Sequence, residues 1–297
     1  MNLLEIILSD YGIHLAILIS LYLILAQSLN LTLGLGQLFN LAHVASYAVG
    51  AYTTALLSTE YESSFAVCVI TSVLISGLSA IMLGGIALRL TSDYFAIGTL
   101  AFSAVISALL INWKSLTKGV LGIPGIPRPE LFGIDFYENS NFLALIFIFA
   151  IATQAILYLV YVSSFGRSLR ALAEHERAAA AIGTNTRLIR NAAFFVSSSF
   201  AGLAGSFFAY YLNYIDPSSF TLGEMVFIVT IVIVGRPGSF WGVIGATVFL
   251  VLLPEPLRFL DLQSAYLGPL RQLLHAVILF GVVWINRNRL FPQRRQV

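Results

Sequence analysis

The stretch at residues 142–162, FLALIFIFAIATQAILYLVYV, contains 21 residues and no charged side chain. A helix of about 20 apolar residues crosses the roughly 30 Å hydrocarbon core of a bilayer. Since backbone amides in that core must be hydrogen-bonded internally, such a run predicts a transmembrane α-helix. This stretch therefore predicts an all-α, integral membrane protein.

The composition of the whole chain agrees with this prediction. Of the 297 residues, 58% are hydrophobic and only 10% are charged, whereas soluble domains carry about 25% charged residues. The single cysteine, Cys68, excludes an intramolecular disulfide framework. The absence of a large basic cluster excludes a nucleic-acid-binding surface. We expect one transmembrane domain over residues 1–297, in the form of a polytopic helical bundle.

Eight further apolar runs predict transmembrane segments, so we expect about nine spans, with eight or ten as alternatives. Two of the runs, 222–235 and 240–253, are short for a bilayer and could form either a tilted pair or a re-entrant excursion. The eight runs lie at residues 11–33, 38–57, 65–88, 94–111, 191–212, 222–235, 240–253 and 270–286.

The positions of the basic residues predict the orientation. Lysine and arginine are enriched in cytoplasmic loops. Arginines crowd residues 163–190 and the C-terminus, and with nine spans eleven of the 16 basic residues fall on one side. We therefore predict an N-terminus outside and a C-terminus in the cytoplasm, with 112–141 as an extracytoplasmic loop and 163–190 as a cytoplasmic loop.

The cytoplasmic loop, SSFGRSLRALAEHERAAAAIGTNTRLIR, is rich in helix-forming residues. It predicts a helix over 167–182 that stops at Gly183, then a second helix capped by Thr184 or Asn185 that re-enters the membrane. Two interpretations stay open. The loop is either an ordinary solvated connection or a docking helix with a small alanine face at 178–181.

Four polar residues in or between the first two spans, Asn30, Gln37, Asn40 and His43, are candidates for lining a translocation path. Polar side chains at membrane depth usually face protein or water and often mark function. The competing explanation is hydrogen bonding between helices. No motif indicates a catalytic residue or a metal site.

Four stretches carry a resemblance to a known family. Residues 176–183 and the basic stretch after them resemble the coupling loop of ATP-binding-cassette importer permeases. Residues 116–129, LTKGVLGIPGIPRP, and 34–52, GLGQLFNLAHVASYAVGAY, are similar to signatures of the branched-chain amino acid permeases, specifically the second of two sister subunits. Residues 194–253 are also similar to that family.

The resemblance implies a set of partners and site residues. It implies a sister permease in a heterodimer, two cytoplasmic ATPase subunits and an extracytoplasmic binding protein that delivers branched-chain or related amino acids. A docking rim for the binding protein would include Lys118, Pro124, Pro127 and Arg128. Coupling to the ATPases would involve Arg167, Arg170, Glu174, His175, Glu176, Ala178, Ala179 and Gly183.

The chain lacks the Gly-x-x-x-x-Gly-Lys-Ser/Thr loop, so we expect it to bind no cofactor and to rely on partner subunits for ATP hydrolysis. The expected location is the cytoplasmic (inner) membrane of a bacterium or archaeon. Alternatives are a permease of the same family for urea, short amides or other amino acids, and an ion-coupled secondary transporter. The Ser115-x-x-Lys118 spacing also occurs in some acylating enzymes, but the companion motifs are missing.

Overall fold

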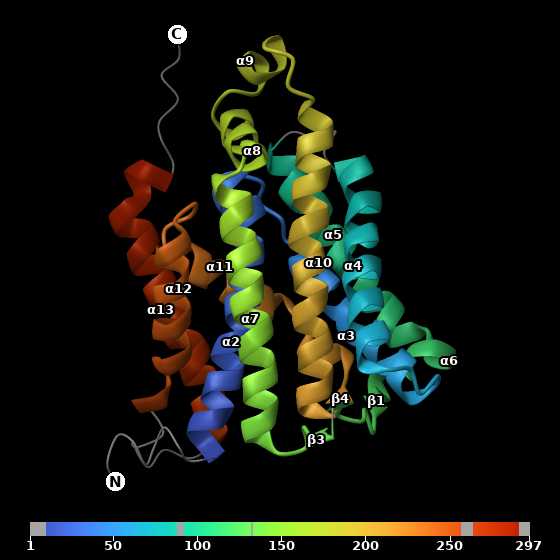
Figure 1. Ribbon diagram of the computed structural model, residues 1–297. Helices are drawn as coiled ribbons and strands as arrows, with labels where there is room; N and C mark the ends of the chain where they lie inside the picture. Colours follow the sequence, from blue (N-terminus) through green and yellow to red (C-terminus); the bar gives the residue numbers. More distant parts are fainter. Residues whose placement is uncertain (1–9, 88–91, 132, 257–263, 291–297) are drawn as a thin grey trace.

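The computed structural model describes residues 10–87, 92–131, 133–256 and 264–290 (Figure 1). Each of the nine predicted spans corresponds to one apolar α-helix. These helices are α2 (Asp10–Asn30), α3 (His43–Thr59), α4 (Phe65–Ala87), α5 (Ser92–Asn112), α7 (Asn139–Val162), α10 (Thr186–Leu212), α11 (Leu222–Val234), α12 (Phe240–Leu252) and α13 (Ser264–Leu290).

Shorter elements connect these helices. A π-helical segment, η1 (Leu31–Leu35), extends α2, and two small helices, α8 (Ser164–Glu174) and α9 (Glu176–Ala181), join α7 to α10. The remaining elements lie together at the other end of the bundle. They are α6 (Lys114–Thr117), η2 (Gly119–Leu121), β1 (Ile123–Pro124), β2 (Glu130–Leu131), β3 (Ile134–Asp135), β4 (Tyr214–Ile215) and η3 (Pro217–Ser219).

Seven helices in the described part of the chain are long and apolar enough to cross a membrane. The all-α membrane fold is therefore confirmed, while the count of nine crossings stays a prediction. The two apolar helices outside these seven are α3, with 17 residues, and α12, with 13 residues. α11 also has 13 residues and is long enough only together with η3. At 1.5 Å per residue α12 is about 20 Å long, which is less than the hydrocarbon thickness.

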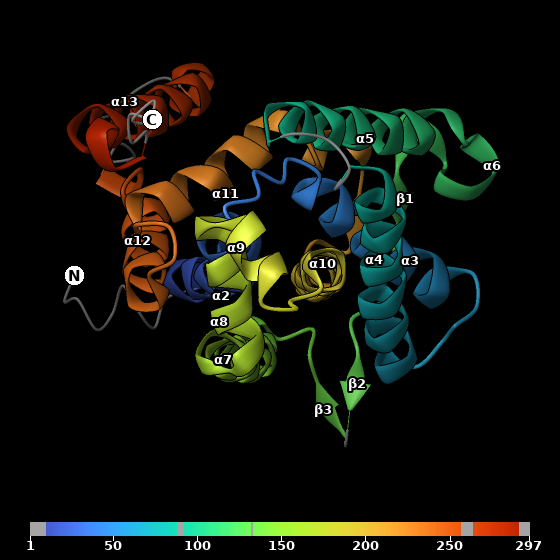
Figure 2. The same cartoon turned by 90° about the horizontal axis from the view of Figure 1, so that it is seen from above.

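α10 is the central helix of the bundle. Viewed from above, it lies among α2, α3, α4 and α7 (Figure 2). Small residues let the backbones approach closely, since a Cβ on Gly50 of α3 would overlap the backbone of Gly202 in α10, and one on Gly202 would overlap Ser76 of α4. Such contacts replace the hydrophobic drive that lipid does not supply between helices.

The ends of the chain's described part lie at opposite ends of the bundle. α2 begins near the β-strands, and α13 ends at the level of α8 (Figure 1). We call these the β-strand end and the α8–α9 end. An odd number of crossings requires this arrangement. Which end faces the cytoplasm stays a prediction from the arginine distribution.

Several predicted boundaries were wrong. α3 begins at His43 rather than at residue 38, because η1 is followed by non-helical backbone in which Gln37 has a φ of 49°. The predicted single helix over 167–182 is broken at His175, whose φ of −148° and ψ of 89° are not helical. The last residues of the loop 163–190 already belong to α10, which begins at Thr186.

Candidate coupling and translocation sites

The helix α8 lies flat against the α8–α9 end of the bundle because one of its faces is apolar. Leu169 and Leu172 are buried, and Leu169 packs in a cluster with Leu31 and Leu35 of η1. Ser163 caps the helix by accepting a hydrogen bond from the amide of Gly166 at 3.2 Å. The segment is therefore fixed to the membrane helices rather than free in solvent.

In contrast, α9 projects beyond the bundle (Figure 1). Gly183 ends this helix with a φ of 87°, a left-handed conformation that favours glycine, and the Thr184 amide donates to the Ala179 carbonyl at 3.1 Å. Ile182, which follows the helix, is 82% exposed. The tip of α9 is therefore accessible from outside the bundle.

The predicted coupling residues lie along α8, α9 and the turn after α9, and Ala179 is the one that is buried. The other seven are exposed: Arg167, Arg170, Glu174, His175, Glu176, Ala178 and Gly183. Two of them have defined partners. Arg167 donates to the Val162 carbonyl at the end of α7 at 2.7 Å, and Glu176 accepts two hydrogen bonds from Arg190 of α10, at 2.8 and 3.0 Å. The ion pair links α9 directly to α10.

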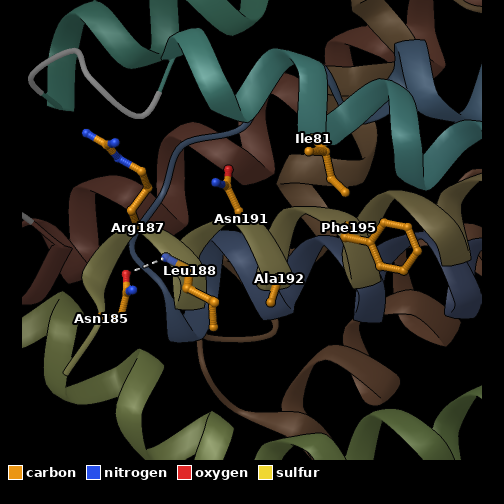
Figure 3. A pocket seen from close by; sticks show the side chains of 7 residues that line it. All are labelled: Ile81, Asn185, Arg187, Leu188, Asn191, Ala192 and Phe195. Atoms are coloured by element: carbon orange, nitrogen blue, oxygen red, sulfur yellow. Dashed lines mark hydrogen bonds between the residues drawn. The ribbon is translucent and has the colours of Figure 1, made fainter.

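A cavity of about 530 Å³ lies between α4 and the start of α10 (Figure 3). Asn185 caps α10 by accepting from the Leu188 amide at 3.0 Å, which selects it over Thr184 as the predicted cap. The Asn191 side-chain oxygen is buried and has no hydrogen-bond partner in the described part of the chain. This cavity was not predicted from the sequence, because one of its walls is Ile81 of α4, which lies about 100 residues before the other lining residues.

The candidate path residue Asn30 ties α2 to the turn between α11 and α12. Its side-chain oxygen accepts from the Gly238 amide at 2.9 Å, and its nitrogen donates to the Ser239 carbonyl at 3.3 Å. Gln27, one turn earlier, donates to the Phe240 carbonyl at 2.9 Å. We call Gln27 and Asn30 the amide clamp. It gives the Gly238 amide an acceptor and adds hydrogen bonds to two carbonyls at the start of α12.

The other three candidate path residues lie in different environments. His43 is fully buried, with its Nε2 3.2 Å from both the Leu25 carbonyl and the Ser28 hydroxyl. Asn40 is buried beside it, but lies before α3 and accepts from the Ala42 amide at 3.0 Å. Gln37 is exposed in the loop. Asn30, Asn40 and His43 form hydrogen bonds within and between elements. None of the four residues lines the cavity between α4 and α10, a cavity between α5 and α11, or a cavity between α11 and α13.

The outer loop is more ordered than its prolines suggested. β1 pairs with β4 through Ile123 and Ile215, and Asn213 donates to the Ile126 carbonyl at 2.7 Å. Lys118 forms an exposed ion pair with Glu60 at 3.2 Å. Pro124 and Pro127 are exposed, as a docking rim requires. Strand pairing to the segment after α10 therefore fixes this part of the predicted loop.

Arg128 differs from the other residues of that rim because its guanidinium points inward. It donates to the carbonyls of Phe136, Tyr137 and Tyr211 and to the Asn139 side chain, at 2.9 to 3.2 Å. It also lies over the rings of Phe142 and Tyr211, at 5.0 and 5.5 Å from their centres. Burial lowers the pKa of Arg128 from its ordinary value. This geometry ties the loop to α7 and α10.

A second cavity, of about 590 Å³, lies at the β-strand end between α5, η3 and the start of α11. Ser103 and Ser107 of α5 line one side, and Asp216 and Thr221 line the other. Hydrogen bonds from Ser218 and Ser219 outweigh partial burial and hold the pKa of Asp216 below its usual range. Serines one turn apart on a helix gave no distinctive sequence signal, so this cavity was not predicted.

The chain matches known proteins over nearly all of its length. The family described as "Branched-chain amino acid transport system / permease component" matches residues 12–283. The "High-affinity branched-chain amino acid transport system permease protein LivM" of Escherichia coli (strain K12) is 35% identical over 286 residues, covering 88% of this chain and 67% of that protein. The protein of the same name from Salmonella typhimurium is 35% identical over 287 residues, covering 89% and 68%. No solved structure gives a significant match.

With its bundle of apolar helices and its projecting segment between α7 and α10, the chain belongs to the permease components of branched-chain amino acid transport systems, which are multi-pass membrane proteins of ATP-binding-cassette importers.

Proposed function

We propose that this chain and a sister permease form the translocation path of an importer for branched-chain amino acids. Two separate ATPase subunits would hydrolyse ATP, and an extracytoplasmic binding protein would deliver the substrate; the chain itself would catalyse no reaction and bind no cofactor. The observation that carries this proposal is the segment α8–α9, which is anchored to the membrane helices at one side and exposed at the other.

The contacts of α8 supply a route by which movement at the ATPases reaches the membrane. Leu169 packs on η1, η1 continues α2, and the amide clamp of α2 holds the turn between α11 and α12. α11 in turn begins at the cavity beside α5. A push on α9 would therefore shift α8, α2 and α11 together, since the packed elements are linked by buried contacts rather than by flexible loops.

We infer that the substrate enters through the cavity between α5 and α11. Its two serine hydroxyls, Thr221 and the Asp216 carboxylate offer hydrogen bonds to a small zwitterion, while Leu100, Ile111 and Leu222 offer apolar contacts to a branched side chain. A pocket of a few polar groups in apolar walls is typical of small-molecule sites.

The function is tested by uptake of labelled leucine into proteoliposomes that hold both permeases and the ATPases. We expect uptake to require ATP inside the vesicles and the binding protein outside. Uptake driven by an ion gradient without ATP would overturn the proposal in favour of a secondary transporter. Labelled urea and short amides, offered with the same components, test the alternative substrates.

The path is tested separately by cysteine accessibility in the assembled importer. Ser107→Cys lines the cavity, whereas the matched control Val105→Cys lies on another face of α5 and is 54% exposed. We expect a polar thiol reagent to block uptake in Ser107→Cys and not in Val105→Cys, with protection by the substrate-loaded binding protein. Equal inhibition of the two variants would exclude this cavity from the path.

A further inference from the structure

The largest of the described cavities, about 900 Å³, lies away from the coupling segment and from the proposed path. It is bounded by α2, α11, the end of α12 and α13. α13 contributes the wall on one side, and in the view from above this helix lies at the edge of the molecule (Figure 2). The cavity is a large space beside a peripheral helix that is little buried along its membrane-spanning part.

The charged side chains of this cavity gather at its β-strand end, whereas Thr230 and His275 line it farther along. Arg271 and Gln272 of α13 lie there with Glu224 of α11 and Glu255, which follows α12. Farther along the cavity the walls are mostly apolar, with Phe227, Leu250, Leu279 and Val283 among the lining residues. The space therefore has a charged mouth and an apolar body.

Arg271 indicates which kind of group the charged mouth of the cavity could bind. Its Nε is buried and has no hydrogen-bond partner among the residues that the structure describes. The ion pairs within 4.0 Å among the described residues are Lys118–Glu60 and Arg190–Glu176, so Arg271 forms no ion pair with Glu224. A buried N–H donor without an acceptor is costly, and the planar donors of arginine match a phosphate.

The length of the cavity fits one leaflet of a bilayer. From Gly268 to Val283 it follows α13 for about 22 Å, at 1.5 Å per residue. Half of a bilayer, including its headgroup region, is about 20–22 Å thick. An amino acid would fill only the charged mouth of such a cavity and would leave its apolar body empty.

We propose that this cavity binds one phospholipid with a primary-amine headgroup. The phosphodiester lies on Arg271 and Gln272, the ammonium group lies on Glu224, and an acyl chain runs along α13 toward Val283. The side chains supply a cation for the phosphate and an anion for the amine at one end, and apolar walls for the chain beyond them. A lipid held here would fill the space between α13 and the α11–α12 pair.

The test measures lipid that stays with the assembled importer, with both permeases and the ATPases present. The complex is exchanged into detergent, incubated with palmitoyl-oleoyl phosphatidylethanolamine, phosphatidylglycerol or phosphatidylcholine, and passed through size exclusion. Retained lipid is then quantified by mass spectrometry. We expect the phosphatidylethanolamine to be retained at about one molecule per copy of this chain, and several-fold more than the other two.

Variants locate the bound lipid. Arg271→Gln should lower retention of phosphatidylethanolamine about tenfold, while the matched control Lys114→Gln, an exposed cation at the same end of the molecule, should not. Glu224→Gln should remove the preference for phosphatidylethanolamine over phosphatidylglycerol. Ala276→Trp fills the cavity and should block binding, whereas Val277→Trp, on the neighbouring position that does not line it, should not.

Three results would overturn the proposal. The first is an assembled importer that retains no lipid above the level of Ala276→Trp, which would mean that a partner subunit covers the cavity. The second is equal retention by Arg271→Gln and the unmodified chain. The third is an equal loss with Lys114→Gln and Val277→Trp. Arg271→Gln removes a charge and Ala276→Trp adds bulk. If one of these variants fails to assemble, the other still tests the proposal.

Discussion

At the scale of single residues, buried polar side chains in this protein mainly hold backbone groups. Asn30 and His43 were predicted as candidates for a path, yet each bonds a carbonyl or amide of another segment. Arg128, predicted for a docking rim, satisfies three carbonyls of its own chain. Sequence identifies such residues as unusual at membrane depth, but whether they face a partner, a substrate or a bent backbone depends on what folds against them.

Replacing Asn30 with leucine, which has a similar volume, should destabilise the protein. The Gly238 amide would lose its acceptor, while the Ser239 carbonyl would keep its hydrogen bond from the Val243 amide, and an unsatisfied backbone donor costs about 1–3 kcal/mol. Thermal unfolding in detergent should show a lower midpoint for Asn30→Leu and little change for Gln37→Leu, whose side chain is exposed. An unchanged midpoint for Asn30→Leu would show that the amide clamp does not stabilise the turn.

At the scale of elements, the predicted helix boundaries differ from the observed ones where the helical backbone is interrupted. Apolar runs located all nine helices, because hydropathy is a property of local sequence. A break after residue 33 was predicted, but not its extent to residue 42, and the break at His175 was not predicted, since no proline marks either position and the interrupted backbone is held by contacts from other segments. For example, Leu41 donates its amide to Thr99 of α5 at 3.1 Å.

The crossing of α3 and α10 should not tolerate an added methyl group. Gly50→Ala would place a Cβ against the backbone of Gly202, which cannot rotate away. We expect a loss of about 1–3 kcal/mol, as for other overpacked contacts. The matched control is Gly245→Ala in α12, where a Cβ meets open space and the change removes backbone freedom from the unfolded chain. Equal unfolding midpoints for the two variants would contradict the close contact.

The turn after α9 should matter for coupling rather than for insertion. Gly183 has a φ of 87°, so Gly183→Val strains the backbone, while Gly183→Asn is tolerated because asparagine adopts this conformation more readily. In proteoliposomes we expect Gly183→Val to lower leucine uptake per ATP hydrolysed, with normal amounts of protein in the membrane. Gly183→Asn should stay close to the unmodified chain. Normal coupling in both variants would show that the conformation of this turn is not required.

At the scale of the whole molecule, the charge distribution and the fold are consistent with each other. The arginine-rich segment 163–190 and the end of α13 lie at one end of the bundle, and the strands β1 and β4 lie at the other (Figure 1). The net charge of +2 conceals this separation. The polarity of the molecule follows from where its few charges fall along the chain, not from their sum.

This polarity predicts which residues are reached from each side of the membrane. Ile182→Cys and Val120→Cys place thiols at positions that are 82% and 72% exposed, at opposite ends of the bundle. In intact cells, a membrane-impermeant thiol reagent should label Val120→Cys and should label Ile182→Cys only after the cells are opened. Labelling of both in intact cells, or the reverse order, would overturn the predicted orientation. The native Cys68 is buried and serves as the background control.

The sequence by itself determined the class of protein, the positions of nine apolar helices and the segment that projects from the membrane, because hydropathy, helix formers and charge placement are local properties of the chain. Tertiary structure decided the rest. It joined Asn30 to Gly238 and Arg128 to Tyr211, and it brought Ser107 beside Thr221 and Glu224 near Arg271 in two cavities. Those pairs lie far apart along the chain, so only the packing of the helices, which depends on side-chain shape in three dimensions, could bring them together.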